Sequence, residues 1–439
     1  MDIDTLNRMV AEDAALRRRQ ILQPAGGKGD KIFPPTYPRE GPNAQPRHVY
    51  ERRRVNGQEL WCVLVDSVQS QANRLEECLL EAIRDGVSIP HVVVDFADTG
   101  LEGIAGITSL DAPHRVYDAI LRDSLLNGAP FMGSEVGKRL AKARPEDASS
   151  LLEISPTALL FGAWHSTGEG GGLGAKFSRC LISEIVAIDV PIEFQQGGRA
   201  SSYLVRVADR LTSFDPVTAA WRPGSRIDPL GVSRQVEIFR SAGDASDWTA
   251  FEDKAAKDKD GKPVPYSRKK GDKAGKPAVI NHGNIKPSLQ PLGVTCDRVE
   301  HSFVLSFSAL RRLRFGEPRK DGAARSLLAA LGFLALVEQD ARGYPLRSRC
   351  DLVCDGRAPL EVVHPDGATE PASMDRAAAR ELYKMAFEAA TKAGFSLSAE
   401  PLRLTPQDKL VEIVRRSQEL ALSGKGGDEP EKEEAAEGQ

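Results

Sequence analysis

Residues 158–190 read ALLFGAWHSTGEGGGLGAKFSRCLISEIVAIDV, and this stretch decides the fold that the sequence predicts. It begins with an apolar segment, for which we expect a strand, and ends in a second strand rich in Ile and Val. Between them, six glycines from Gly162 to Gly174 allow the backbone to adopt positive φ and to approach a bulky ligand closely. Lys176 and Arg179 follow the glycines, so the stretch predicts a loop that meets phosphate.

Two patterns typical of nucleotide cofactors fit this loop poorly. A P-loop requires a lysine directly after its last glycine, but Ala175 stands before Lys176. Gly170, Gly172 and Ala175 match the dinucleotide pattern, which counts only where a helix follows, and the residues that follow alternate as a strand. We therefore expect no cofactor. A plain hairpin connection and a loop that contacts single-stranded nucleic acid remain as alternatives, and we favour the second.

Charge is distributed unevenly along the 439 residues, whose composition is that of a globular protein. The formal net charge is −3, but Asp428–Gln439 alone carries −5 and Asp253–Lys286 carries +6. A basic cluster of this kind favours a polyanionic partner. The six cysteines form no CxxC motif, which indicates reduced thiols and no metal site. No secretory signal and no membrane-spanning run is visible, so we expect a cytoplasmic protein without a membrane partner.

Strand and helix patterns alternate along much of the chain. Residues 1–20 predict a helix, and residues 23–46 predict an extended arm. Asn56-Gly57 predicts a hairpin turn, LWCVLVDS (60–67) a central strand and residues 69–85 an amphipathic helix. HVVVDF (91–96) predicts a buried strand, and Pro113 predicts a helix start. The order predicts an α+β sheet with helices on one side, as in ferredoxin-like and RNA-recognition-motif folds. Residues 242–291 lack apolar periodicity and predict a mobile insertion or a protruding hairpin. A strand near 303–307, an apolar helix over 321–342 and helices near 374–393 and 406–421 precede the acidic tail.

Six segments together resemble a known family. They are VDSVQSQANRLE (65–76), ITSLDAPHRVYDA (107–119), LLFGAWHSTGEGGGLGAKFSRCLISEI (159–185), INHGNIKPS (280–288), ALRRLRF (309–315) and LRSRCDLV (346–353). In this order they are similar to the repeat-associated (RAMP) backbone subunit of type I-G CRISPR systems, formerly called I-U. The resemblance spans most of residues 65–353.

The resemblance implies a palm with an RNA-recognition-motif-like (ferredoxin-like) fold, helical insertions and a thumb-like hairpin insertion. The expected parts are an N-terminal helix and extended arm (1–57), the first part of the palm (58–241), a lysine-rich thumb-like insertion (242–296), the remaining palm and C-terminal helices (297–421), and a disordered acidic tail (422–439). Subunits of this family polymerise along a CRISPR guide RNA (crRNA) within a Cascade complex, together with other subunits, and the guide pairs with one strand of target DNA. The resemblance implies no catalysis by this subunit.

Contacts to a guide RNA must be independent of its sequence, because the guide changes with every spacer. Such contacts place cations on phosphates, and hydroxyl or amide groups on ribose and phosphate oxygens. We predict that these residues bind RNA: Gln69, Ser70, Asn73, Arg74, Ser166, Thr167, Lys176, Arg179, Lys269, Lys270, His282 and Asn284.

Structural alternatives exist for several of these residues. Ser67 or Ser70 could instead cap the first helix, Arg74 could pair with a nearby acid, and His282 could shape a turn. The Lys269-Lys270 pair also fits an exposed flexible loop.

Two other functions compete with a binding subunit. The first is an endoribonuclease that processes CRISPR repeat RNA through a histidine general acid or base, for which His165, His114 and His282 are candidates. The second is a nucleotide-dependent switch built on the glycine loop. Cleavage abolished by mutation of one histidine would favour the nuclease, and tight binding of ATP or NAD would favour the switch.

Overall fold

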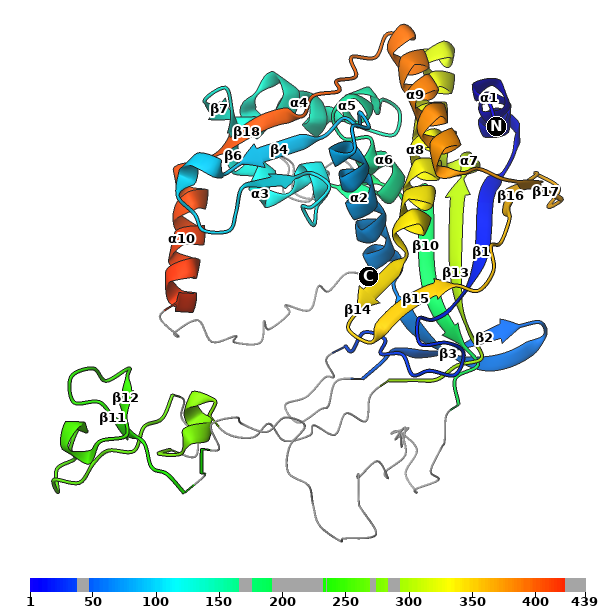
Figure 1. Ribbon diagram of the computed structural model, residues 1–439. Helices are drawn as coiled ribbons and strands as arrows, with labels where there is room; N and C mark the ends of the chain where they lie inside the picture. The colour runs from blue at the N-terminus through cyan, green and yellow to red at the C-terminus, as the bar shows by residue number, and fades with distance from the viewer. Residues whose placement is uncertain are drawn as a thin grey trace, which may run out of the picture. The chain divides into compact units, whose positions relative to one another are not determined.

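Figure 1 shows the computed structural model of the chain. The structure describes residues 1–37, 47–165, 176–191, 232–233, 235–268, 274–282 and 293–422. The chain divides into two compact units, the first made of Met1–Pro191 with Gly293–Gln439 and the second of Ile192–Leu292. In sequence, the second unit is therefore an insertion within the first.

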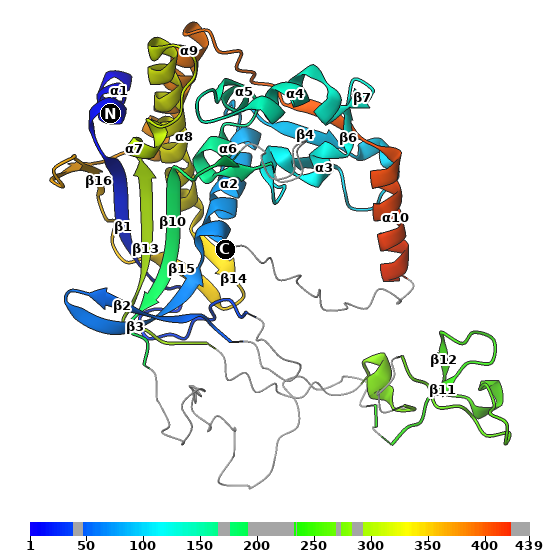
Figure 2. The ribbon, with the colours of Figure 1, turned by 180° about the vertical axis from the view of Figure 1, so that it is seen from behind.

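The first unit is built on a curled antiparallel sheet of nine strands. Seven of them lie in the order β14-β15-β1-β13-β10-β3-β2, and the β16–β17 hairpin joins through β1. Figures 1 and 2 show its long central strands side by side. The bounds are β1 Ala15–Pro24, β2 Tyr50–Val55, β3 Gln58–Asp66, β10 Leu181–Ile188, β13 Arg298–Ser306, β14 Tyr344–Arg347, β15 Cys350–Cys354, β16 Leu360–Val363 and β17 Thr369–Ala372.

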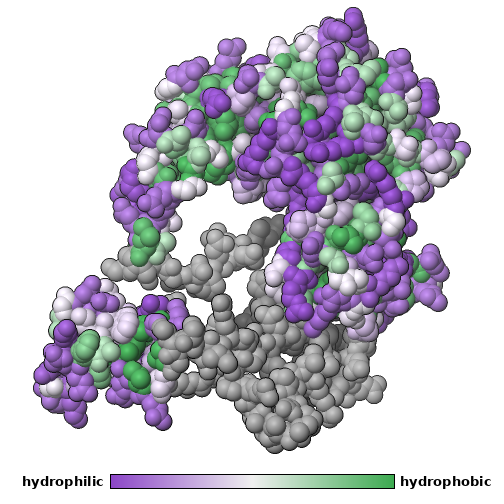
Figure 3. Space-filling view, viewed as in Figure 1, coloured by the Kyte–Doolittle hydropathy of each residue, from purple (hydrophilic) through white to green (hydrophobic). Residues whose placement is uncertain are grey.

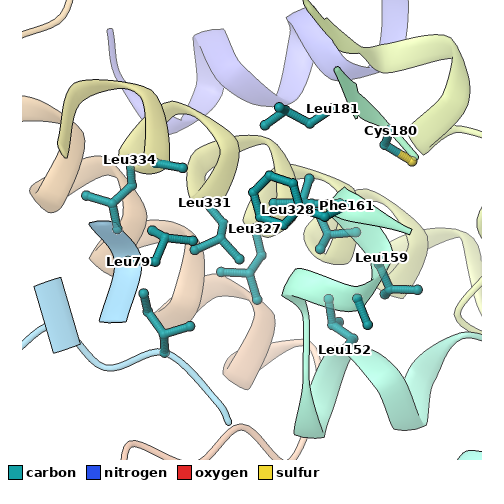
Figure 4. Packing of buried hydrophobic residues seen from close by; sticks show 14 of the residues in the cluster. Leu79, Leu152, Leu159, Phe161, Cys180, Leu181, Leu327, Leu328, Leu331 and Leu334 are labelled. Atoms are coloured by element: carbon teal, nitrogen blue, oxygen red, sulfur yellow. The ribbon is translucent and has the colours of Figure 1, made fainter. Parts of the chain in front are cut away.

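Helices α2 (Val68–Arg84) and α8 (Pro318–Arg342) pack against each other and against this sheet. The middle of α8 is buried along its whole circumference, which explains why its apolar residues do not form a stripe. Gly332 lies where α8 meets the sheet, because a Cβ there would lie 3.1 Å from the Leu305 side chain. Figure 4 shows Leu327, Leu331 and Leu334 of α8 packing in the same core as Leu79 and Leu181.

Further helices surround α8. α1 (Ile3–Glu12), α7 (Phe307–Leu310) and α9 (Arg376–Lys392) contact it, and α9 is tied to it by ion pairs. The Glu338 carboxylate of α8 is fully buried and accepts hydrogen bonds from Arg376 at 2.7 Å and Arg380 at 2.6 Å. These bonds compensate the cost of burying the charge.

A smaller sheet of the first unit has the strand order β5-β4-β18-β6-β7, in which β18 runs parallel to β4. Its strands are β4 Val92–Asp95, β5 Gly106–Thr108, β6 Ser124–Leu126, β7 Ala129–Pro130 and β18 Leu402–Pro406. The neighbouring helices are α3 Ala119–Arg122, α4 Glu135–Lys142, α5 Ser149–Ile154, α6 Thr157–Phe161 and α10 Asp408–Leu422. The pairing of β4 with β18 joins parts of the chain about 300 residues apart, which local sequence patterns cannot reveal.

In the second unit, the described residues form a short antiparallel pair, β11 (Phe239–Arg240) with β12 (Trp248–Thr249). Two 3₁₀ turns accompany it, Glu252–Lys254 and Pro277–Ile280. Its buried apolar side chains are few and include Phe239 and Tyr266. A stretch with so few apolar residues buries little surface, as the composition of residues 242–291 predicts.

The α+β class is confirmed, and so are several predicted elements. Asn56 and Gly57 have φ of 48° and 83° and join β2 to β3 by a two-residue turn. β3 is an interior strand, and the helix predicted over 69–85 is α2. The helices predicted over 321–342, 374–393 and 406–421 are α8, α9 and α10.

The helix predicted over residues 1–20 is wrong beyond residue 12. Residues 15–24 form β1, which lies inside the main sheet between β13 and β15, so the extended arm expected from residue 23 begins within a strand. The strand escaped detection because two of its inward-facing residues, Arg18 and Gln20, are polar. Arg18 binds Asp340 at 2.7 Å, and Gln20 donates to the Gly356 carbonyl at 2.6 Å.

Two further element predictions are wrong. The apolar segment before the glycines is the helix α6, followed by the two-residue strand β8 (Ala163–Trp164). The helix expected at Pro113 is reduced to a 3₁₀ turn at Arg115–Tyr117 and the single turn of α3. The acidic tail from residue 423 lies outside the described residues, and the predicted domain boundaries remain predictions.

Charged and polar side chains cover much of the described surface seen in Figure 3. In the described part of the chain, no helix is both long and apolar enough to cross a membrane. Nor do the described residues contain a group of three or more His, Cys, Asp or Glu side chains arranged to hold a metal ion.

Candidate functional site

A pocket of about 640 Å³ opens in the first unit where the start of α2, the segment at residues 113–115 and the base of the glycine loop meet. The base of the loop is a short antiparallel ribbon of β8 and β9 (Lys176–Phe177). The pocket is lined by Val68, Pro113, His114, Arg115, Phe161, Gly162, Ala163, Trp164, Lys176, Phe177, Ser178, Arg179 and Ile182. None of these described lining residues is acidic.

The ribbon is held by a close backbone approach at Gly162. This glycine has φ of 84°, and a Cβ there would lie 3.0 Å from the Phe177 carbonyl oxygen. Ala163 pairs with Phe177 and Trp164 with Lys176, so the side chains of Trp164 and Lys176 lie on one face of the ribbon. Phe177 is buried and Trp164 is 52% exposed, so the face of the ribbon that carries Trp164 and Lys176 is the one exposed to solvent.

Arg115 connects the ribbon to the rest of the fold through hydrogen bonds. Its guanidinium donates to both oxygens of Glu76 at 2.8 and 2.7 Å and to the Gly162 carbonyl at 3.0 Å. Both side chains are buried, and burial raises the pKa of Glu76 to about 7 against the opposing effect of Arg115. Because its guanidinium donates to Glu76 and to the Gly162 carbonyl, Arg115 positions the ribbon.

Lys176 and Arg179 supply the uncompensated charge of the pocket. Both side chains are exposed, and no described acidic residue lies within salt-bridge distance of either one. Burial, together with the charge of Arg115, lowers the pKa of Arg179, which as an arginine still remains protonated at neutral pH. The Lys176 ammonium lies 5.6 Å from the centre of the Trp164 ring. The pocket therefore presents two cations beside an aromatic ring.

The start of α2 lies next to this pocket, because its first residue, Val68, is part of the lining. Ser67 is the N-cap and accepts a hydrogen bond from the Ser70 backbone nitrogen. Gln69 and Asn73 are exposed at this end of the helix. They are free to meet a ligand at a helix end that carries partial positive charge.

Two other predicted residues of α2 are already engaged by the fold. The Ser70 hydroxyl donates to Asp66 at 2.8 Å, and Arg74 donates to Asp66 at 3.0 Å and to the Leu346 carbonyl at 2.6 Å. The acid predicted as an alternative partner of Arg74 is thus Asp66. Its carboxylate is fully buried and also accepts from Arg347 at 3.0 Å. Two arginines on one carboxylate leave a net positive charge at this position.

The candidate histidines occupy different environments. His165 is buried and stacks on Tyr117 with ring centres 4.8 Å apart, and burial lowers its pKa. His114 is exposed and lines the pocket. His282 belongs to the second unit, where its ring lies edge-on to Trp248 at 6.5 Å. The structure therefore brings His114 into the pocket that holds Lys176.

Five of the predicted residues lie outside the described part of the chain: Ser166, Thr167, Lys269, Lys270 and Asn284. Sequence reasoning missed Trp164, Ile182 and Arg347. The position of Trp164 between Gly162 and the glycine run was an available signal, because an aromatic residue in a loop next to cations is typical of nucleic-acid binding. The roles of Ile182 and Arg347 depend on neighbours far away in sequence.

Residues 16–192 match the family model described as CRISPR-associated protein GSU0053. This match makes residues 16–192 of the 439-residue chain similar to a CRISPR-associated family. The pocket lies within this matched segment, together with α2 and β10. The similarity indicates a role in CRISPR defence. Comparison with curated proteins gave no match.

Proposed function

We propose that this protein is the guide-RNA-binding backbone subunit of a type I-G CRISPR effector complex. The observation that carries the proposal is the pocket beside α2, in which Lys176 and Arg179 stand without a described acidic partner. Two such cations next to a helix N-terminus suit the phosphates of a single-stranded polyanion. The exposed amides of Gln69 and Asn73 add hydrogen-bonding groups for phosphate or ribose oxygens.

These groups recognise a sugar-phosphate chain without reading its bases. Cations and amides bind phosphate and 2′-hydroxyl groups, which every nucleotide carries. A subunit with such contacts accepts any guide sequence, as a CRISPR effector requires. In this proposal the chain performs no bond cleavage, and recognition of one strand of target DNA comes from base pairing with the guide.

The order of the main strands supports a ferredoxin-like, RNA-recognition-motif-like palm. Along the chain, the elements follow as β1, α2, β10, β13, α8 and β15, which is the βαββαβ succession. In the sheet the same strands lie as β15-β1-β13-β10, so the fourth strand is next to the first and the third separates the first from the second. This order supports the ferredoxin-like palm that we propose. The β2–β3 hairpin extends the sheet. In sequence, the second unit, which we propose as the thumb, is inserted between β10 and β13.

Several copies of the subunit would bind side by side along one guide RNA, together with other Cascade subunits, in the cytoplasm. Repeating contacts to a uniform backbone account for such a filament, because each copy meets the same chemical groups. The proposed thumb, with its basic Asp253–Lys286 stretch, supplies further charge for RNA.

Binding assays with unrelated RNA sequences test this function. Fluorescence anisotropy should give similar affinities for several single-stranded RNAs of equal length and different sequence, and a much weaker affinity at high salt. The RNA should remain intact after incubation. Binding that requires one particular sequence, or the absence of any RNA binding, would refute the proposal.

A processing endoribonuclease is the second candidate, favoured by the exposed His114 in the pocket. A histidine near a bound phosphate can act as a general acid or base. Incubation of the chain with CRISPR repeat RNA distinguishes the two functions. Cleavage that is lost in His114→Ala and kept in His282→Ala would establish the enzyme, whereas intact RNA with both proteins supports the binding subunit.

A further inference from the structure

The exposed indole of Trp164 is the largest apolar group that faces the pocket, and the described fold does not cover it. It is 52% exposed on a ribbon whose opposite face is buried through Phe177. A partner that covers this ring would remove a large apolar surface from water, which favours binding at this position.

The backbone that carries the ring is fixed by the fold. Trp164 pairs with Lys176 across the ribbon, and the ribbon is fixed by the hydrogen bond from Arg115 to the Gly162 carbonyl. Arg115 is itself bound at two points to the buried Glu76. A ligand that stacks on Trp164 therefore needs to order very little of the protein on binding.

Two exposed apolar side chains of the main sheet accompany the ring. Ile182 of β10 lines the same pocket and is 48% exposed. Val304, the residue of β13 that pairs with Ile182, is 37% exposed. Ile182 shares the pocket with Lys176 and Arg179, and none of the described residues that line the pocket is acidic. Charge complementarity thus favours an anionic ligand with a flat apolar part, which describes a nucleotide.

We propose that Trp164 is a stacking platform for an unpaired base of the bound RNA, an assignment that rests on the proposed function and makes it more specific. The Lys176 ammonium lies 5.6 Å from the centre of the Trp164 ring. On binding, Lys176 moves to a phosphate of the same nucleotide chain and the base takes its place on the ring. Stacking of a base on an aromatic side chain is stronger than a cation–π contact at an exposed site, so the exchange is favourable.

Abasic RNA separates stacking from phosphate binding. The probes are a single-stranded oligouridylate and an oligomer of the same length in which every base is removed. Trp164→Ala should bind oligouridylate about 10-fold more weakly than the wild type and bind abasic RNA equally well. Trp164→Phe should keep most of the affinity, and Lys176→Gln should weaken the binding of both probes. Ile413→Ala, an exposed apolar residue outside the pocket, is the matched control and should change neither affinity.

Each other outcome identifies which idea fails. If Trp164→Ala binds both probes like the wild type while Lys176→Gln weakens them, the stacking platform is refuted and the RNA-binding function stands. Equal weakening of both probes by Trp164→Ala would show a structural role for the ring and would also refute the platform. If the wild type binds neither probe, the proposed function fails together with the inference. Thermal unfolding of each variant checks that the fold is intact.

Discussion

Removal of the two uncompensated cations of the pocket should reduce the salt dependence of RNA binding by a calculable amount. Lys176→Gln and Arg179→Gln each delete one charge for which no described acidic partner exists. For single strands, each lost phosphate contact lowers the slope of log K against log salt by about 0.7. The double variant should therefore have a slope smaller by about 1.4.

The difference in slope can be converted into a ratio of affinities at two salt concentrations. Between about 50 and about 200 mM salt, each phosphate contact costs roughly 2.6-fold in affinity, and two contacts cost roughly 7-fold. The wild type should thus lose about 7-fold more affinity over this range than the double variant does. Anisotropy titrations at four salt concentrations determine both slopes.

The matched control is the double variant Lys384→Gln with Arg319→Gln, which removes the same charges at exposed positions outside the pocket. Its slope should equal that of the wild type. Since Lys176 and Arg179 are exposed, their replacement should change the free energy of unfolding by less than about 0.5 kcal/mol. Equal slopes for wild type and the pocket variant would refute the assignment of these cations to phosphates.

Three further predictions concern the fold that supports the site. Asp66→Asn removes a buried charge that holds two arginines and should lower the free energy of unfolding by about 3–5 kcal/mol in urea titrations. Burial lowers the pKa of His301 from its ordinary 6.5 to about 3. Between these two values the unfolded chain binds a proton at this histidine and the folded chain does not. Stability from this group is present above pH 6.5 and should fall by about 2 kcal/mol between pH 7 and pH 5, a loss that His301→Gln should abolish. Leu331→Ala, in the core of Figure 4, should cost about 2–5 kcal/mol of unfolding free energy.

Controls make these three outcomes decisive. Asp98→Asn and Leu422→Ala alter exposed residues of the same types and should change the unfolding free energy by less than about 0.5 kcal/mol. A stable Asp66→Asn protein would show that the two arginines do not depend on that carboxylate. A pH profile shared by the wild type and His301→Gln would show that other groups cause the acid sensitivity.

Local patterns predicted the elements that depend on local chemistry. Asn56-Gly57 forms its turn because both residues tolerate positive φ, and α2 forms because its apolar residues recur at helical spacing. β10 was predicted because its alternation and branched residues suit a strand that packs on helices.

β1 could not be predicted in the same way. Its alternation is hidden by Arg18 and Gln20, which point inward and are satisfied by Asp340 and by the backbone near Gly356. Those partners lie more than 300 residues away, and only the folded chain brings them together. Without them, two inward polar residues in a central strand would be strongly unfavourable.

The residues of the site also divide into those with a local sequence signal and those whose role depends on distant partners. Lys176 and Arg179 were predicted because a cation after a run of glycines is a local signal. Arg115 had no such signal, since its role depends on Glu76, 39 residues earlier, and on Gly162, 47 residues later. The exposure of Trp164 follows from the face of the ribbon that Phe177 buries, which the sequence alone does not define.

Sequencing of the nucleic acid that copurifies with the protein and its partner subunits tests the central claim most directly. The account predicts short RNAs that share a constant repeat-derived segment and differ in the remainder, because the protein binds the backbone of any guide. It also predicts that Lys176→Gln with Arg179→Gln reduces the amount of this RNA without changing its sequence composition. Purified complexes that contain no RNA, or RNA of a single unrelated sequence, would contradict the account.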